Sequence, residues 1–498
     1  MTTKWRNIDI RALAMLASCV LSAWHIFINP IPNADAFSYL RTATVYLDSG
    51  IAAAFSWYPS ATYPVLMGVL NQATGINLLT AGQLINTLFY AVVVYAFISI
   101  PLEFRNSSRI ALIAAVFILV FPTLNEYRYY LIRDIGFLAF MLLAALQLIR
   151  YAKRENNAHA IAFIFLVLAA ALFRSEALVY LPLAPVALLA HSRGNWGSFL
   201  KIEGFLLAVS ACVLALFFLL NVDVVNILQR VLTVYWPFLR DALSAMSDAD
   251  STLSVAIFGD YASNFSGQYI WLFMLTGLSA VLLAQLLNGL GIPVLLLFLY
   301  GVVKHKAVFS DKNVRVMLFF NVVAFMILLV FLALTRFIST RYTMMFSLSV
   351  LAVLPLVLDN LLTRIEQLQR RKLAQAVLVF LVLFSAIDAH VSFGGSRNSL
   401  QNAVDWLANN TLEGDALFTN SRYIAYYSGK VENYDEISRY MEDGAIQNSQ
   451  YGTIMVLMMS SSNDAQIARS LEFQQLEPLA AFPNEQEPEV LIYRRLGN

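Results

Sequence analysis

Long apolar runs recur along this chain of 498 residues, and most are long enough to cross or nearly cross a lipid bilayer. Hydrophobic residues make up 59% of the sequence and charged residues only 13%, whereas soluble domains have about 45–50% and about 25%. A soluble globule could not cover so much apolar surface with so few charges, and disordered chains have the opposite composition. The sequence therefore predicts a polytopic α-helical membrane protein.

The apolar runs predict eleven transmembrane helices. They lie near residues 8–28, 78–100, 109–124, 131–150, 158–173, 177–190, 202–221, 283–303, 314–334, 342–362 and 373–390. The first run is longer than the apolar core of a signal peptide, and no small-residue cleavage site follows it before Pro30, so we expect it to be retained. The stretch 266–303 is too long for one span, and we expect an interfacial helix near 268–281 before the span.

Lysine and arginine predict the orientation. In this arrangement 18 of the 33 fall in the N-terminal segment and in the short loops on the same side, eight fall on the other side of the membrane region, and seven more lie in the C-terminal tail. Because positive residues collect in cytoplasmic loops, the N-terminus is expected in the cytoplasm and the tail outside the membrane. The sequence ends without an ER-retrieval signal, so we expect a bacterial inner membrane with the tail in the periplasm.

The composition changes near residue 391, which divides the chain into a transmembrane domain, 1–390, with a first outer loop at 29–77, and a C-terminal domain, 391–498. The tail contains 14 acidic and 7 basic residues. Its pattern predicts helices and strands in alternation, and hence a small extra-cytoplasmic α/β domain. The expected helices are 398–410, 434–443 and 463–472, and the expected strands are 415–419, 453–459 and 490–493.

Several classes of function are disfavoured. Two cysteines cannot form a disulfide framework or a thiolate metal cluster, and no pair of the five histidines has the i, i+4 spacing of a helical zinc site. Neither a Walker motif nor a dinucleotide fingerprint is found in the tail. The net charge of +1 gives no indication of nucleic-acid binding, and no internal repeat supports an inverted-repeat transporter.

Acidic residues at the outer ends of helices are the first candidate site residues. Asp35 opens an amphipathic stretch that includes Tyr39, and either Asp35 or Asn33 could instead be the N-cap of a helix on the membrane surface. Asp134 lies just inside an apolar helix, where a carboxylate is costly unless it is paired. The alternative there is a local pair that anchors the helix end, formed among Glu126, Arg128, Arg133 and Asp134.

Arginines on the same side are the second group. Arg174 and Glu176 separate two short apolar runs, and Arg336, Arg341 and Tyr342 precede a late helix. Such arginines could simply mark the level of the lipid headgroups. Guanidinium groups also bind phosphate and pyrophosphate through two parallel hydrogen bonds, which suits a lipid-phosphate-linked sugar.

In layout the chain resembles the GT-C superfamily of polyprenyl-phosphate-sugar-dependent membrane glycosyltransferases, which includes protein O-mannosyltransferases and the aminoarabinose transferase of lipid A. The residues that match the family pattern are Asp35, Tyr39, Gly50 and Tyr63-Pro64 in the first loop, Asp134 at the fourth helix, Arg174 at a half-spanning hairpin and Arg341-Tyr342 before a late helix. The chain departs from the pattern at Ala36, where many members have a second acid, and at Arg174, where many have lysine.

The resemblance implies inverting transfer of one sugar from a polyprenyl-phosphate donor to a lipid, glycan or protein acceptor at the outer face. Asp35 would act as the base or orient the acceptor, and Asp134 would support it. The donor phosphate would be held by Arg174 and Arg341, with Tyr342 and Arg133. Supporting positions would be Tyr39, Glu176, Glu126, Arg128, Tyr63 and Arg336. Membrane lipids are the other expected partners, no cofactor is assigned, and a divalent metal is left open.

Two other functions remain open from the sequence. A glycan ligase or polymerase of the inner membrane would also use outer arginines with a lipid pyrophosphate donor, but such enzymes usually carry a large loop late in the chain, and the loop 222–267 is of moderate size. A lipid or solute transporter predicts charges in mid-membrane, whereas most charges here lie at the ends of the predicted spans.

Overall fold

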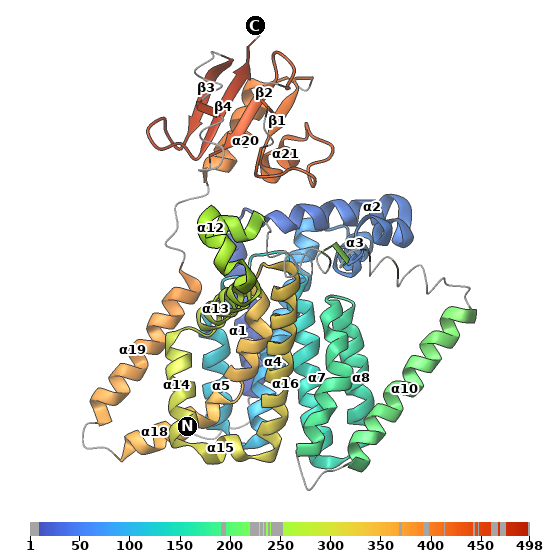
Figure 1. Ribbon diagram of the computed structural model, residues 1–498, viewed down its shortest axis with the longest axis vertical. Coiled ribbons are helices and arrows are strands. Elements are labelled where there is room, and N and C mark those ends of the chain that lie inside the picture. Colours follow the sequence, from blue (N-terminus) through green and yellow to red (C-terminus); the bar gives the residue numbers. More distant parts are fainter. Residues whose placement is uncertain are drawn as a thin grey trace, which may run out of the picture. The chain divides into compact units, whose positions relative to one another are not determined.

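The computed structural model describes residues 9–190, 196–219, 252–367, 371–391, 398–412, 414–441, 444–446, 448–459 and 475–496, with a few single positions between these ranges. The chain divides into two compact units, whose helices and strands are labelled in Figure 1. The helical unit comprises Met1–Ser22, Thr87–Arg128 and Arg133–Val391. The mixed unit comprises Ala23–Asn86, Tyr129–Ile132 and Ser392–Asn498.

Among the described residues, seven helical segments are long and apolar enough to cross a membrane. Six are single helices: α1 (Ile10–Ile28), α4 (Leu78–Phe104), α7 (Asp134–Arg154), α10 (Trp196–Leu219), α16 (Lys312–Thr335) and α19 (Arg371–His390). The seventh is the segment Ser254–Leu290, which joins most of α12 (Thr252–Ser266) through η4 (Gly267–Tyr269) to α13 (Ile270–Leu290). The predicted polytopic helical membrane protein is thereby confirmed.

Shorter or bent apolar helices occupy other predicted spans. The shorter ones are α5 (Ser108–Val120), α8 (Asn157–Ala171), the run of η2 (Ser175–Val179), α9 (Tyr180–Leu183) and η3 (Ala184–Ala190), and α14 (Ile292–Lys304). The bent one joins η5 (Thr340–Thr343) and α17 (Met344–Leu351) to α18 (Leu354–Glu366) at 48°. Pro355 in the first turn of α18 explains the break, because proline cannot donate the hydrogen bond that would continue α17. Length and composition support seven spans, or eight with the bent pair.

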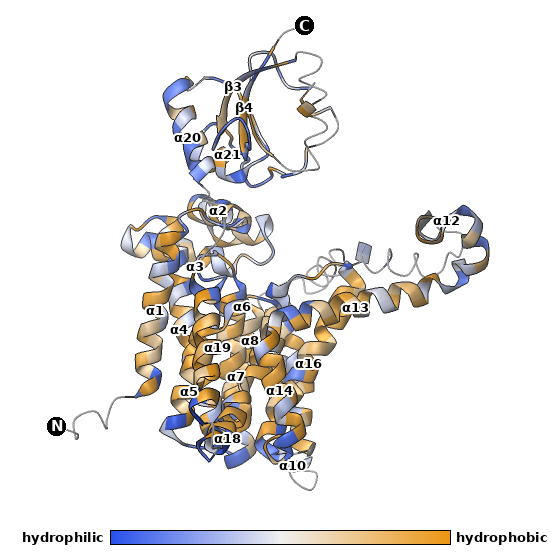
Figure 2. Ribbon diagram, turned by 90° about the vertical axis from the view of Figure 1, so that its left-hand side faces the viewer, coloured by the Kyte–Doolittle hydropathy of each residue, from blue (hydrophilic) through white to orange (hydrophobic). Residues whose placement is uncertain are grey.

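The stretch expected to hold an interfacial helix at 268–281 and a span at 283–303 is divided differently. α13 continues to Leu290, Gly291 has φ of 73°, and α14 begins at Ile292 with Pro293 in its first turn. Glycine adopts this left-handed φ without a steric penalty, and proline favours a helix start, so the boundary falls at Gly291. Figure 2 shows α13 leaning away from α14 and α16, with apolar residues along it.

The helical unit is built around α7, the most enclosed of the seven long helices. α7 packs against α8 and α16, and Gly136 on α7 lets the ring of Phe173 approach so closely that an added Cβ would lie 2.6 Å from it. The short helices α6 (Pro122–Asn125) and α15 (Lys306–Ser310) connect longer ones. Close packing around Gly136 therefore fixes the residues just after α8 against the first turn of α7.

Arg128 is buried inside the helical unit, with 2% of its surface exposed. It donates hydrogen bonds to the Asn125 side chain at 2.5 Å, to the carbonyl and hydroxyl oxygens of Ser18 at 3.0 and 3.1 Å, and to the Ser22 hydroxyl at 2.8 Å. Its guanidinium also lies 4.6 Å from the centre of the Tyr90 ring. Arg128 thus ties α1 and α4 to the segment after α6, and these contacts stabilise the fold.

The mixed unit combines the segment at 29–77, which the sequence predicts to be the first outer loop, with the tail. α2 (Ala34–Trp57) bends at Gly50, where φ is 84°, and α3 (Thr62–Thr74) ends at Gly75. Tail helix α21 (Arg422–Ser428) packs on α2: Phe37 touches the rings of Tyr423 and Tyr426, and Arg422 donates to the Ala34 carbonyl at 3.3 Å. The tail is therefore in contact with the helix that carries Asp35.

A four-stranded sheet forms the core of the tail. Its order is β1 (Leu417–Thr419), β2 (Ile454–Met458), β4 (Val490–Arg495) and β3 (Leu476–Phe482), with β1 and β2 parallel and the other pairs antiparallel. Helix α20 (Asn398–Asn410) packs on β3 and β4. The small α/β domain, three of its strands and the helix at 398–410 are confirmed.

The tail also differs from the sequence prediction at three elements. The described part of the expected helix at 434–443 forms turns, because the carbonyls of Ile437 and Arg439 accept hydrogen bonds from Arg422 and Asn420 instead of bonding within a helix. Strand β3 was not predicted, since it contains Pro478 at a register shift. Helix α21 was missed because its isoleucine and tyrosines favour strands. The expected helix at 463–472 lies almost entirely outside the described residues.

Candidate functional site

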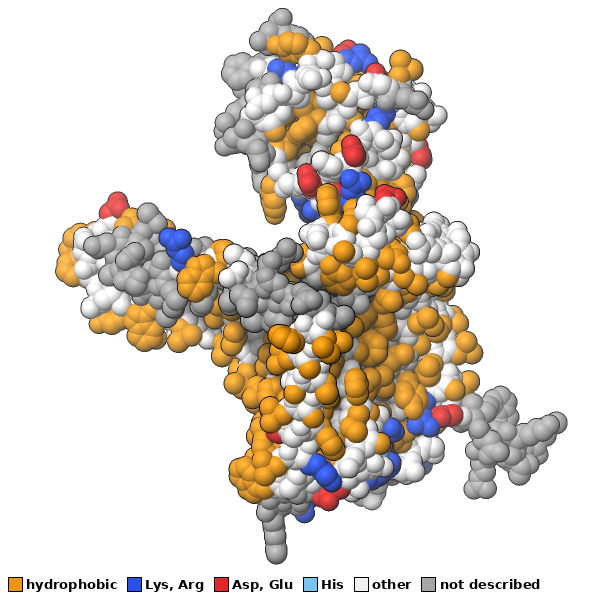
Figure 3. Space-filling model, turned by 90° about the vertical axis from the view of Figure 1, so that its right-hand side faces the viewer, with side chains coloured by type: hydrophobic (Ala, Val, Ile, Leu, Met, Phe, Trp, Pro, Cys, Tyr) orange, Lys and Arg blue, Asp and Glu red, His pale blue; other side chains and the backbone are white. Residues whose placement is uncertain are grey.

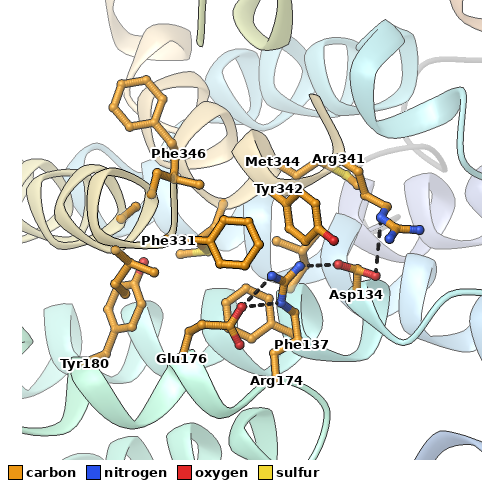
Figure 4. Close-up of a pocket in the computed structure, with 15 residues that line it drawn as sticks. Asp134, Phe137, Arg174, Glu176, Tyr180, Phe331, Arg341, Tyr342, Met344 and Phe346 are labelled. Atoms are coloured by element: carbon orange, nitrogen blue, oxygen red, sulfur yellow. Dashed lines mark hydrogen bonds and ion pairs between the residues drawn. The ribbon is translucent and has the colours of Figure 1, made fainter. Parts of the chain in front are cut away.

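Three segments far apart in the sequence bring charged side chains together in the helical unit (Figure 4). Asp134 is the first residue of α7, and Arg174 and Glu176 lie where the chain passes from α8 to η2. Arg341 and Tyr342 belong to η5, the single turn before α17. We call Asp134, Arg174, Glu176, Arg341 and Tyr342 the charged cluster.

Arg174 is at the centre of the charged cluster. Its Nη1 donates to Asp134 Oδ1, and its Nε and Nη2 donate to Glu176 Oε1 at 2.9 and 2.5 Å. Arg341 approaches the other Asp134 oxygen, with 3.9 Å between Nε and Oδ2. The two arginines, 167 positions apart in the sequence, therefore share one carboxylate.

The charges of the cluster are balanced and partly shielded from solvent. Only 7% of the Asp134 side chain and 13% of the Arg174 side chain are exposed, against 25% for Glu176 and 22% for Arg341. Burial by itself would lower the pKa of Arg174, but the carboxylates of Asp134 and Glu176 outweigh it and raise that pKa above its ordinary value. Arg174 is thus a permanent cation held by two anions.

An aromatic ring supports both guanidinium groups. The Tyr342 ring centre lies 4.8 Å from Arg174 and 5.5 Å from Arg341, distances at which cations are attracted to the ring face. Phe331 packs against Tyr342 with 5.0 Å between ring centres. The Tyr342 ring, held in place by Phe331, therefore helps to position both arginines.

A small cavity of about 40 Å³ opens beside the charged cluster. Its other walls are mostly apolar and come from α7, α9, α16 and α17, with Phe137, Ile327, Phe331, Met345 and Phe346 among them. A site with charges beside an apolar wall suits an amphipathic ligand whose anionic group meets the arginines and whose hydrocarbon lies along the wall. At this size the cavity holds a water-sized group, so a larger ligand requires the side chains to separate.

The other predicted site residues of the helical unit are Glu126, Arg128, Arg133 and Arg336, and of these Arg133 adds a positive charge that acts on Asp134 and Glu176. The described hydrogen bonds of Arg128 go to Ser18, Ser22 and Asn125, and not to Asp134 or Glu126 as the local pair would require. Glu126 is the exposed C-cap of α6, Arg133 is the N-cap of α7, and Arg336 ends α16 with φ of 55°.

Asp35, Tyr39 and Tyr63 belong to the mixed unit. The N-cap of α2 is Asn33, not Asp35. The Asn33 side-chain oxygen accepts a hydrogen bond from the Leu131 N–H at 2.8 Å, and its side-chain nitrogen donates to the Leu131 carbonyl at 3.3 Å. Asp35 is half-buried in the first turn. Tyr39 packs edge-on against Tyr63 at 5.4 Å, and the Tyr63 hydroxyl donates to the Gly82 carbonyl at 3.0 Å. These tyrosines fix the helix that carries Asp35.

The residues that sequence reasoning missed are the aromatic ones around Arg174. Phe137, Tyr180 and Phe331 line the cavity, yet in the sequence they are ordinary members of apolar helices. Within the ranges that the structure describes, no group of three or more His, Cys, Asp or Glu side chains is arranged to hold a metal ion. The two acids of the charged cluster, Asp134 and Glu176, each pair with Arg174 through one carboxylate oxygen.

Comparison of the sequence with models of known protein families and with curated proteins gives no match.

Proposed function

We propose that this chain is a membrane glycosyltransferase that moves one sugar, with inversion, from a polyprenyl-phosphate donor to a lipid, glycan or protein acceptor. The observation that carries the proposal is the charged cluster, in which two arginines converge on one carboxylate beside an apolar cavity wall. Guanidinium groups suit the phosphate of such a donor, and the apolar wall suits its hydrocarbon chain.

In the proposed reaction, the acceptor hydroxyl oxygen forms a bond to the anomeric carbon of the sugar. The bond between that carbon and the phosphate oxygen breaks, and the polyprenyl phosphate leaves with the electron pair. The proton of the hydroxyl passes to a carboxylate, for which Asp35 is the leading candidate. Arg174 and Arg341 stabilise the negative charge that grows on the leaving phosphate.

The resting arrangement of Arg174 adds a step to this proposal. Its Nε, Nη1 and Nη2 all donate to Asp134 or Glu176, so a donor phosphate must compete with these carboxylates for it. Arg341, which makes the longer contact of 3.9 Å with Asp134, is the easier of the two to recruit. We infer that the phosphate meets Arg341 first and then displaces a carboxylate from Arg174.

The proposed topology keeps the eleven predicted spans, with α5, α8, the Ser175–Leu189 segment and the bent pair among them and with one span at 283–303, across the end of α13 and α14. It places the N-terminus in the bacterial cytoplasm and the tail in the periplasm. Figure 3 supports this orientation. The side of the helical unit seen in that view is mostly hydrophobic, and lysines and arginines gather at one end of it. Positive residues favour the cytoplasmic side.

We expect a reporter enzyme that is active only in the periplasm to be active when fused after Val391 and inactive when fused after Lys372. These positions lie at the two ends of α19, so the pair of fusions measures whether that helix crosses the membrane outward. Equal activity of the two fusions, or the reverse result, would overturn the proposed orientation of α19.

Arg341→Ala should lower the rate of sugar transfer at limiting donor by roughly tenfold to a hundredfold, because a hydrogen bond to a charged group contributes about 1.5–3 kcal/mol. Arg341→Lys should lose less, since it keeps the charge without the planar guanidinium. The measurement is release of polyprenyl phosphate by purified protein in liposomes supplied with polyprenyl-phosphate-linked sugars.

The matched control for this experiment is Arg109→Lys, because Arg109 pairs with Asp359 and Glu366 and is no part of the charged cluster. Turnover only with polyprenyl-pyrophosphate donors would support a glycan ligase or polymerase instead. No turnover with either donor class by stable wild-type protein, across a panel of acceptors, would count against glycosyl transfer.

A further inference from the structure

A second cavity, of about 570 Å³, lies at the other end of α7 from the charged cluster. Its walls come from the first turn of α1, the last turns of α4 and α7 and the start of α5. α7 has 21 residues, so the two cavities are separated along it by roughly 30 Å, about the thickness of the hydrocarbon core of a bilayer. In the proposed topology α7 crosses the membrane, which puts the second cavity at the headgroup level of the opposite face.

Positively charged side chains outnumber carboxylates in the wall of this cavity. Arg11, Arg150, Lys153 and Arg154 line it together with two carboxylates, which leaves a net charge of +2. Arg11 pairs with Asp9 at 2.7 Å. The single carboxylate of Glu103 faces the other three cations, at 2.7 Å from Arg150, 3.1 Å from Lys153 and 3.6 Å from Arg154. One carboxylate cannot neutralise three cations, so the cavity attracts an anion.

Neutral hydrogen-bond donors open into the same cavity. Ser107 is the N-cap of the 13-residue helix α5, and its hydroxyl does not cap the helix, so the first backbone N–H groups of α5 remain available to an anion. Ser99, which is only 2% exposed, also lines the cavity, and its hydroxyl has no hydrogen-bond partner in the described part of the chain. A buried hydroxyl of this kind indicates a missing ligand or water.

We propose that this cavity is a binding site for a phosphate-bearing anion, supplied by the headgroup of an anionic phospholipid or by free phosphate. Three cations beside a helix N-terminus and serine hydroxyls match the oxygens of a phosphate group. Ile10, Leu102 and Ala111 add an apolar margin, which would meet the glycerol and acyl chains of a lipid. Basic pockets between helix ends bind anionic headgroups in this way.

The test uses the full-length protein and substitutes Ser107, because aspartate and asparagine are both favoured at the N-cap position and have nearly the same shape. Both variants therefore keep a helix start at Ser108, but Ser107→Asp adds a negative charge to the cavity, whereas Ser107→Asn is its neutral control. The wild type should bind phosphatidylglycerol more tightly than phosphatidylcholine when each is titrated and bound lipids are counted by native mass spectrometry. A parallel titration with inorganic phosphate, followed by thermal unfolding, tests the free anion.

Ser107→Asp should weaken phosphatidylglycerol binding by about tenfold or more, because like charges repel at short range, while Ser107→Asn binds like the wild type. Arg154→Gln should weaken binding less, since its side chain is 56% exposed. Stabilisation by inorganic phosphate that is lost in Ser107→Asp would identify free phosphate as a sufficient ligand. Equal binding by the Asp and Asn variants, or no binding of either probe by the wild type, would overturn the proposal.

Discussion

Asp35→Asn is expected to reduce sugar transfer by about 10²–10⁴-fold, the usual cost of losing a general base. Asparagine has nearly the same shape, but its amide does not accept the proton of an acceptor hydroxyl at neutral pH. Because Asn33 rather than Asp35 is the N-cap of α2, the substitution should leave the helix and its packing intact. The measurement is turnover by the purified variant in the donor assay with polyprenyl-phosphate-linked sugars.

Asp48→Asn is the matched control, since Asp48 is an exposed residue of the same helix. It should transfer sugar at the wild-type rate and have the wild-type melting temperature. Near-normal turnover by Asp35→Asn would remove Asp35 from the proposed reaction. A large loss in both variants would point instead to a requirement for the overall charge of α2.

Arg174→Gln is expected to destabilise the protein by about 3–5 kcal/mol, the usual cost of breaking a buried ion pair from one side. The substitution leaves the carboxylates of Asp134 and Glu176, with 7% and 25% of their side chains exposed, without their shared hydrogen-bond donor. The effect should appear as a lower melting temperature in detergent and as a smaller yield of monodisperse protein.

The matched control for Arg174 neutralises the carboxylates as well. Arg174→Gln combined with Asp134→Asn and Glu176→Gln should recover most of the lost stability, because no uncompensated charge is left in the cluster. The triple variant should still fail to transfer sugar. If the triple variant were no more stable than Arg174→Gln alone, the destabilisation would come from lost packing against Tyr342 and not from the charges.

Several helices could be predicted closely from the hydropathy pattern of the sequence. The expected helix at 398–410 coincides with α20, and the runs expected at 314–334 and 373–390 match α16 and α19 within about two residues. Each has a strong apolar or amphipathic pattern of its own, so local information is sufficient. Helix α21 and strand β3 were not predicted, because their neighbours in the fold decide their conformation.

The boundary at Gly291 illustrates a finer limit. Gly291 and Pro293 were visible in the sequence, but glycine is common inside membrane helices and is no reliable breakpoint there. The structure shows that Gly291 has a left-handed conformation and that α13 leans away from the helices beyond it (Figure 2). Glycine permits that conformation, while the packing of α13 and α14 against different neighbours selects it.

The sequence by itself determined that the chain is a helical membrane protein with an α/β tail, and it singled out Asp134, Arg174 and Arg341 as costly charges at helix ends. It could not tell which arginine meets Asp134. Arg128 and Arg133 were the nearer candidates, yet the ion pairs of Asp134 are with Arg174 and Arg341, 40 and 207 positions away, and Arg128 is bonded to serines of α1. A charge at the end of an apolar helix is a local property, which the hydropathy pattern reveals. Its partner depends on which helices pack together, and only the tertiary structure decided that packing.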